Sequence, residues 1–257
     1  MIRRGVSLAL LSVLAGASTA AAAAPAGFRV VQMNLCNGGY DGCYADGQVL
    51  PEAGDLIRSL APNVVTLNEV CRGDVTGPLL TALEAAWPGD RTYEIFEPSI
   101  DRRTGAAYRC VTGDDYGVAV IGRLAGSTAS PVFTTGLLTA QDSGNEERGY
   151  ACVAVAGDHV ACTAHPTPSN KTVALAQCEQ VVTAEPATAR TVVGGDLNLR
   201  TGGGATGVEA CVPAGWSRAD DGAVQHVLVS ADFTVTSVST APLTYSDHDA
   251  LVVDLSS

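Results

Sequence analysis

Lysine is almost absent from this chain of 257 residues, and negative charge dominates it. Of the 15 basic residues only Lys171 is a lysine, whereas 27 acidic residues bring the formal net charge to −12. A protein that coats duplex DNA needs a Lys- and Arg-rich face, so this balance excludes that class. Any nucleic acid must be held locally, and a metal ion is the expected means.

Charged residues of both signs are also scarce, at 16% of the chain, against about 25% in soluble domains. Hydrophobic residues make up 46%, while 28 glycines and 12 prolines show no collagen-like or low-complexity bias. Disordered and fibrous classes are therefore excluded. The length leaves ample material for a packed core.

The chain lacks an apolar run long enough to span a membrane, which takes about 20 residues. Its amino terminus has Arg3 and Arg4, then an apolar stretch from Val6 to Ala15, then small residues from Gly16 to Ala24. This order is typical of a secretory signal peptide. We predict a signal peptide at 1–24, cleaved near Ala20 to Ala24, and export to the periplasm or the extracellular space without stable membrane insertion.

No Cys-x-x-Cys pair with metal-site spacing occurs among the eight cysteines. An even number of cysteines in an exported protein predicts four disulfides, with free buried thiols as the alternative. Eight cysteines allow 105 pairings, so the connectivity stays open. Local loops and sequence order favour Cys36 with Cys43, Cys71 with Cys110, Cys152 with Cys162, and Cys178 with Cys211.

Internal repeats and long linkers are absent too, which predicts a single domain over 25–257 and a monomer. Helical spacing appears only at Glu52–Leu60, Gly77–Trp87 and Lys171–Ala184. Val-rich runs of strand length are about three times as many: Phe28–Asn34, Asn63–Val70, Tyr93–Phe96, Tyr116–Ile121, Ala151–Val155, His159–Ala164, Thr191–Val193, Val224–Ser230 and Ala250–Leu255. The pattern predicts packed sheets flanked by helices rather than a doubly wound parallel sheet.

Several predicted strands finish with a polar residue that does not belong in a core. These residues are Asn34, Glu69, His165 and Asp196, and Asp247 and His248 precede the last strand. Each alone is typical of a solvated loop, but packed sheets bring their strand ends to one rim. A set rich in oxygen donors suits magnesium, with manganese or calcium as alternatives.

Motifs built on these residues follow one another along nearly the whole mature chain. They are Gln32-Met33-Asn34, Leu67-Asn68-Glu69-Val70, Tyr116-Gly117-Val118-Ala119-Val120, Arg148, Thr163-Ala164-His165, Gly195-Asp196-Leu197-Asn198, Val227-Leu228-Val229-Ser230 and Ser246-Asp247-His248. In this order they resemble the endonuclease/exonuclease/phosphatase superfamily. The resemblance implies a deoxyribonuclease I-like fold, a four-layer α/β/β/α sandwich of two packed mixed β-sheets, and metal-dependent hydrolysis of phosphoesters.

The resemblance also implies a role for each residue. Glu69, with Asn34 and Asp247, would hold the divalent cation, which withdraws charge from the scissile phosphate. His248 would take a proton from the attacking water as general base. Asp196 would align that water or hold a second metal.

The remaining roles concern the phosphate oxygens. Asn198 and His165 would donate hydrogen bonds to the non-bridging oxygens as negative charge develops. Arg148 would make a bidentate phosphate contact. The alternative for Arg148 is a surface arginine near Glu146 and Glu147.

One position departs from the superfamily pattern. Gln225 stands where an Asp usually orients the catalytic histidine, so we expect it to support His248 without a negative charge. The neighbouring His226 is expected to be a packed strand residue, and His159 to lie at a turn.

Together these features predict a secreted, metal-dependent phosphodiesterase, most of all a nuclease, with nucleic acid as its substrate. The acidic charge opposes nucleic-acid binding, and a local cluster of Arg102, Arg103 and Arg109 is expected to compensate. The alternatives are a sphingomyelinase-like phospholipid phosphodiesterase, a phosphatase of small phosphoesters, and a secreted binding module without catalysis.

Overall fold

The computed structural model describes residues 27–40, 42, 44–185 and 190–257. The predicted signal peptide, residues 1–24, lies outside the described residues. Among the described residues, no helix is both long and apolar enough to cross a membrane.

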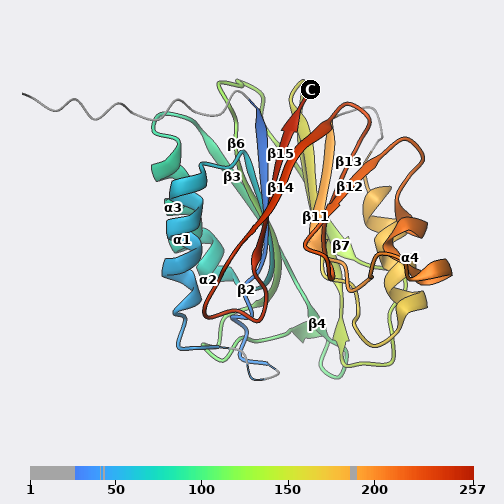
Figure 1. The fold of residues 1–257 in the computed structure, drawn as a ribbon. Helices are drawn as coiled ribbons and strands as arrows, with labels where there is room; N and C mark the ends of the chain where they lie inside the picture. Colours follow the sequence, from blue (N-terminus) through green and yellow to red (C-terminus); the bar gives the residue numbers. More distant parts are fainter. Residues whose placement is uncertain (1–26, 41, 43, 186–189) are drawn as a thin grey trace, which may run out of the picture.

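Two six-stranded sheets pack face to face in the middle of the molecule (Figure 1). The first sheet has the strand order β14 (Thr234–Ala241), β15 (Ala250–Ser256), β1 (Phe28–Asn34), β2 (Val64–Cys71), β6 (Tyr116–Arg123) and β3 (Thr92–Pro98). The second has the order β12 (Ser217–Asp220), β13 (Gln225–Val229), β11 (Thr191–Asp196), β10 (His159–Ala164), β9 (Gly149–Val155) and β7 (Val132–Leu137).

Helices cover the outer face of each sheet. The first sheet is covered by α1 (Val49–Leu60) and α3 (Leu80–Ala86), preceded by short α2 (Arg72–Asp74) and the π-helical turn Val75–Leu79. The second sheet is covered by α4 (Lys171–Val182) and by the 3₁₀ turns Gly204–Thr206 and Val208–Cys211. The predicted four-layer α/β/β/α sandwich is therefore confirmed.

Alternating side chains of the Val-rich strands supply the core layers, because successive residues of a strand face opposite sides of the sheet. Val30 packs between the sheets, in one cluster with Val192 of β11. Its neighbour Val31 faces outward and packs with Ile57 of α1. Each such side chain stabilises the fold by roughly 1.5–3 kcal/mol when fully buried.

Both sheets are mixed, and the parallel pair in each sheet determines which strand ends lie at the same edge of the sandwich. β1 pairs in parallel with β2, with Asn34 opposite Asn68, and β10 pairs in parallel with β11. β15 runs antiparallel to β1, so the loop before it reaches the same end. The polar residues after these strands consequently meet at one rim.

All three predicted helices are present, and α4 begins as expected behind Asn170, whose side chain accepts hydrogen bonds from the backbone of Thr172 and Val173. The edge strands β7, β12 and β14 were not predicted. β7 and β14 are largely exposed, so they lack a continuous apolar run. His159 is not in a turn, because it opens β10, is buried and hydrogen-bonds the hydroxyl of Tyr93 at 2.6 Å.

Three disulfides confirm the predicted pairs Cys71–Cys110, Cys152–Cys162 and Cys178–Cys211. The fourth predicted pair joins Cys36 to residue 43, which lies outside the described residues. Cys152 and Cys162 face each other on the antiparallel strands β9 and β10, as expected for a hairpin bridge.

The double variant Cys71→Ser/Cys110→Ser is expected to lose about 4 kcal/mol of unfolding free energy, because the bridge closes a loop across a sequence separation of 39. Urea unfolding under non-reducing conditions measures the loss. Mass spectrometry of the alkylated, unreduced wild type should show no labelled cysteine, and two or more labels would contradict the four-bridge prediction.

Candidate active site

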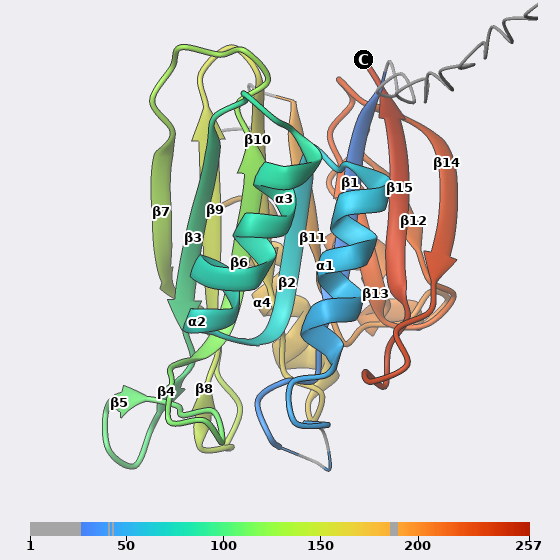
Figure 2. The ribbon, with the colours of Figure 1, turned by 90° about the vertical axis from the view of Figure 1, so that its left-hand side faces the viewer.

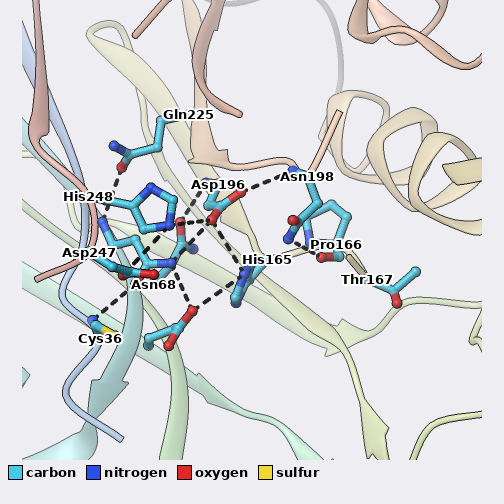
Figure 3. A network of polar contacts seen from close by, with 12 residues as sticks. Cys36, Asn68, His165, Pro166, Thr167, Asp196, Asn198, Gln225, Asp247 and His248 are labelled. Carbon is cyan, nitrogen blue, oxygen red and sulfur yellow. Dashed lines mark hydrogen bonds and ion pairs between the residues drawn. The ribbon is translucent and has the colours of Figure 1, made fainter. Parts of the chain in front are cut away.

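A cavity of about 210 Å³ opens at the rim where β1, β2, β10 and β11 end. Seven of the nine predicted site residues line it: Glu69, Arg148, His165, Asp196, Asn198, Asp247 and His248. The other two, Asn34 and Gln225, are fully buried beneath it. The strand-end residues thus come together as expected, and Figure 3 shows their polar contacts.

Glu69 sits at a β-bulge near the end of β2. The pairing of β2 with β6 shifts register between Asn68 and Val70, so Glu69 has no partner in the ladder. Its φ of 54° is in the left-handed region, which a residue with a long side chain seldom adopts. Bulges and strained backbone of this kind occur beside active sites, where they redirect one side chain.

The carboxylate of Glu69 is largely buried among groups of like charge. Its Oε1 accepts a hydrogen bond of 2.9 Å from Nδ2 of Asn34. Burial, and next to it the negative charges of Asp247 and Asp196, raises the pKa of Glu69 to about 6, although the Asn34 hydrogen bond opposes the rise. Burial is thus the main reason that the charged form of Glu69 is disfavoured, and the neighbouring carboxylates add to it.

Asp196 occupies the centre of the site (Figure 3). Its Oδ1 accepts a 3.1 Å hydrogen bond from the backbone of Asn198, and its Oδ2 lies 3.2 Å from Nδ2 of Asn34. The same Oδ2 lies 3.5 Å from Nε2 of His248 and 3.7 Å from Nε2 of His165. One buried carboxylate thus stands between two imidazoles.

The two imidazoles lie in different environments. Nδ1 of His165 accepts a 2.9 Å hydrogen bond from the Arg148 guanidinium, which can only donate, so the proton of the neutral ring is on Nε2. Burial, together with the positive charge of Arg148, holds the pKa of His165 well below its usual value. His165 is therefore a neutral donor directed at the cavity. His248 is more open to solvent, with 21% of its side chain exposed.

Arg148 is not a free surface arginine. Its Nη1 donates to Nδ1 and to the backbone oxygen of His165, and its Nη2 pairs with Glu146 at 2.9 Å. Both Nη groups already have partners, which differs from the predicted bidentate phosphate contact. In this structure Arg148 fixes the ring orientation and tautomer of His165.

Asn198 also has a left-handed backbone, with φ 54°. Its Nδ2 donates to the backbone oxygen of Pro166, and its own backbone oxygen accepts a 2.6 Å hydrogen bond from Nζ of Lys171. These contacts hold the side-chain amide at the wall of the cavity.

The side-chain amide of Asn34 is not oriented to bind a metal ion through its oxygen, the role predicted for it. Its side-chain oxygen accepts a hydrogen bond from the backbone N–H of Cys36, while its Nδ2 donates to Glu69 and Asp196. In this orientation Asn34 aligns the two carboxylates, and direct coordination through its oxygen would require the amide to reverse.

Gln225 makes no hydrogen bond to His248 in the part of the chain that the structure describes, contrary to our expectation. Its Oε1 accepts from the backbone N–H of Asn34 at 3.1 Å, and its Nε2 donates to the backbone oxygen of Asp249 at 2.6 Å. The side chain thus points between the sheets and joins the end of β1 to the loop that carries His248. His226 is a buried strand residue, as predicted, and its Nε2 donates to the backbone oxygen of Leu199.

Gln225→Glu is expected to lower the unfolding free energy by about 2–3 kcal/mol at pH 7.5, because an acceptor would face the Asp249 oxygen and the nearby Asp221 carboxylate. Protonation of the new carboxyl restores a donor, so the loss should shrink at pH 4.5. Urea unfolding at both pH values tests this, and a loss independent of pH would contradict the assigned hydrogen bonds.

Asn68 is the site residue that sequence reasoning missed. Its Oδ1 accepts from Nε2 of Gln32 and from the backbone N–H of Asp196, both at 2.7 Å, and its Nδ2 donates to the backbone oxygen of Ala164. It thus ties β2 to both β10 and β11. The available signal was an amide in the middle of a buried valine-rich strand.

The donor set fits a hard divalent cation. The described residues contain no ready-made group of three or more metal-ligating side chains. Mg²⁺ does not need one, because it is usually bound by one or two carboxylates, several waters and the substrate phosphate. Glu69 and Asp247 offer carboxylate oxygens at the cavity wall.

A family model described as "Endonuclease/Exonuclease/phosphatase family" matches residues 45–248. No curated protein matches the sequence significantly.

Solved structures with this fold cover about nine-tenths of the chain. An endonuclease/exonuclease/phosphatase from Beutenbergia cavernae is 21% identical, with a TM-score of 0.62 over 90% of this chain and 71% of that one. A mannosyl-6-phosphatase from Bacteroides thetaiotaomicron is 14% identical, with a TM-score of 0.60 over 89% and 99%. D. rerio TDP2, complexed with a single-strand DNA product, is 14% identical, with a TM-score of 0.58 over 90% and 100%. At these identities the likeness shows the fold alone.

Proposed function

Because the chain belongs to the endonuclease/exonuclease/phosphatase family, whose members are phosphoester hydrolases, we propose that it is an exported, divalent-cation-dependent phosphodiesterase of the nuclease type. One observation carries the proposal. The buried carboxylate of Asp196 lies between a neutral His165 and a more exposed His248, beside Glu69, in one cavity. This arrangement supports the proposal, because hydrolysis of a phosphodiester needs both a proton acceptor for the attacking water and hydrogen-bond donors for the phosphate oxygens.

The carboxylates of Glu69 and Asp247 would hold the cation, and Mg²⁺ fits best because it is usually bound by one or two carboxylates, whereas Ca²⁺ takes six to eight oxygen ligands. A cation there withdraws charge from the phosphate and stabilises the leaving oxygen. Asn34 keeps the Glu69 carboxylate in place through its Nδ2.

His248 is the better of the two imidazoles to act as general base. Protonation of Nδ1 of His165 would break its hydrogen bond with Arg148, and the pKa of His165 is already held low. Nε2 of His248 instead lies 3.5 Å from Asp196, whose negative charge would stabilise the imidazolium formed when water is deprotonated. That distance is longer than a good hydrogen bond, as is common before substrate binds.

His165 and Asn198 face the cavity as donors. The Nε2–H of His165 and the amide of Asn198 would hydrogen-bond the non-bridging phosphate oxygens as charge develops. Arg148 contributes by holding His165 as the Nε2–H tautomer.

Three disulfides support export, because such bridges persist in oxidising compartments. Nucleic acid outside the cell is then an accessible substrate. The net charge of −12 favours short, local contacts over a long duplex footprint.

A substrate panel tests the proposal, with plasmid DNA, RNA, a single-stranded oligonucleotide, sphingomyelin and a hexose phosphate, each with Mg²⁺, Mn²⁺ and Ca²⁺. We expect cation-dependent cleavage of a nucleic acid. Cleavage of only sphingomyelin or only the monoester would replace the nuclease assignment, and no hydrolysis with any cation would overturn the catalytic one.

A further inference from the structure

A second cavity, of about 490 Å³, lies beside the active-site cavity, and most of its wall comes from other residues. Residues 99–110, which we call the arm, supply all of its lining except Tyr40. The arm contains β4 (Ile100–Asp101) and β5 (Ala106–Ala107). These strands form a small sheet with β8 (Glu146–Glu147), away from the two large sheets (Figure 2). Tyr40 lines both cavities.

Three tyrosine rings form a continuous wall from one cavity to the other. Tyr116 lines the active-site cavity, Tyr108 lines the second, and Tyr40 stands between them with ring-centroid distances of 5.2 and 5.4 Å. The Tyr40 hydroxyl donates to the backbone oxygen of Arg109, which fixes this ring against the arm. A tyrosine ring in the wall of a cavity can stack on any nucleobase.

Two guanidinium groups stand at the margin of the second cavity. The side chains of Arg103 and Arg109 are 62% and 59% exposed. Arg103 pairs with Asp101, which also lines the cavity, so that pair is neutral. Arg109 shares the carboxylate of Asp115 with Arg72, so one negative charge serves two positive ones.

The arm is tied to the catalytic strand. The Cys71–Cys110 disulfide joins it to the last residue of β2, two residues after Glu69. Arg102 is not among the residues that line the cavity, and it pairs with Glu147 at 3.2 Å. The second cavity is therefore held at a fixed place relative to the Glu69 carboxylate, which reduces the entropy lost when a ligand spans both cavities.

We propose that the second cavity is a subsite for the nucleotide next to the scissile phosphate of a single-stranded nucleic acid. The base stacks on Tyr108, and the phosphate of that nucleotide contacts Arg109 and Arg103. The proposal rests on the proposed nuclease function and adds the substrate form. A base must be unstacked to reach an aromatic ring, and a duplex would require the long basic surface that this acidic chain lacks.

Fluorescence anisotropy of a labelled tetrathymidylate in EDTA tests the subsite without turnover. Arg109→Gln and Tyr108→Ala are each expected to weaken binding at least about 5-fold, whereas Tyr108→Phe, which keeps the ring, stays within about 2-fold of wild type. The matched control is Arg58→Gln, an exposed arginine of α1 paired with Asp55, which should leave binding unchanged. Circular dichroism confirms that each variant is folded.

A kinetic comparison gives the second readout. Arg109→Gln should raise KM for the tetranucleotide at least about 5-fold with kcat unchanged, and should not alter hydrolysis of methyl p-nitrophenyl phosphate, which is too small to span both cavities. Equal losses on both substrates, wild-type binding by Arg109→Gln and Tyr108→Ala, or tighter binding of duplex or of sphingomyelin vesicles would each overturn the subsite. If phosphodiesters are hydrolysed and the arm variants have no effect, the subsite alone is refuted. If the tetranucleotide is bound through Tyr108 and Arg109 but no substrate is hydrolysed, the binding site is supported and the nuclease function is refuted.

Discussion

Glu69→Gln is expected to lower kcat at saturating Mg²⁺ by about 10³-fold or more, because a neutral amide is a poor ligand for a hard cation. The bulge and the left-handed φ of 54° place this carboxylate at the cavity wall, where Asp247 is the other carboxylate assigned to the cation. Steady-state hydrolysis of the preferred substrate measures the loss. A variant that keeps more than about a tenth of wild-type turnover at limiting Mg²⁺ would exclude Glu69 as the main ligand.

The same substitution should stabilise the protein in EDTA. The folded-state pKa of Glu69 is raised from 4.5 to about 6, so the folded protein binds the proton more tightly than the unfolded chain. Unfolding free energy is then lost as pH rises through the window from 4.5 to 6, by up to about 2 kcal/mol. Glu69→Gln removes this loss, so its advantage over wild type should be larger at pH 7.5 than at pH 4.

Urea unfolding in EDTA at the two pH values checks the sign. Added Mg²⁺ should stabilise wild type but not the variant, because only the carboxylate gains a charge partner. A wild type that becomes more stable in EDTA as pH rises from 4.5 to 6, with no such rise in Glu69→Gln, would contradict the assigned environment of this carboxyl.

His248→Ala is expected to reduce kcat by about 10²- to 10⁴-fold, the usual effect of removing a general base. The ring is partly exposed, so its loss should leave the unfolding free energy nearly unchanged.

Two matched variants separate the imidazoles. His226→Ala removes a buried ring outside the active-site cavity, and it should lower stability more than turnover. Arg148→Gln should lower kcat less than His248→Ala does, because it loosens the orientation and tautomer of His165 and leaves the His248 ring in place. If His226→Ala and His248→Ala lost turnover equally in folded protein, the assignment of the base would be wrong.

The rim of the site could be predicted from sequence because a simple physical rule controls it. A Val-rich strand that finishes in Asn34, Glu69 or Asp196 places a polar side chain just beyond the core, and parallel pairing aligns those ends. Two helices were predicted by the same kind of local signal: α4 by its N-cap residue Asn170, and α1, which ends at Leu60, by its apolar spacing. These signals are local, so one sequence is enough to read the secondary structure from them.

Side-chain partners could not be predicted in the same way. The position of Gln225 on a strand end is readable, but its amide faces Asn34 and Asp249 across the gap between the sheets, and only tertiary packing decides that. Tertiary packing also decides that the Asn34 side-chain oxygen accepts from Cys36 and that Arg148 hydrogen-bonds His165. The edge strand β7 was missed because strand patterns are clear only where one face is buried.

The most direct test of the catalytic assignment is a cation titration of EDTA-treated protein, followed by hydrolysis of a single-stranded oligonucleotide at pH 7.5. The account predicts no cleavage in EDTA, saturable cleavage as Mg²⁺ is added, and no recovery by Glu69→Gln at any Mg²⁺ concentration that saturates wild type. Cleavage in EDTA at the Mg²⁺ rate, or equal recovery by Glu69→Gln, would contradict it.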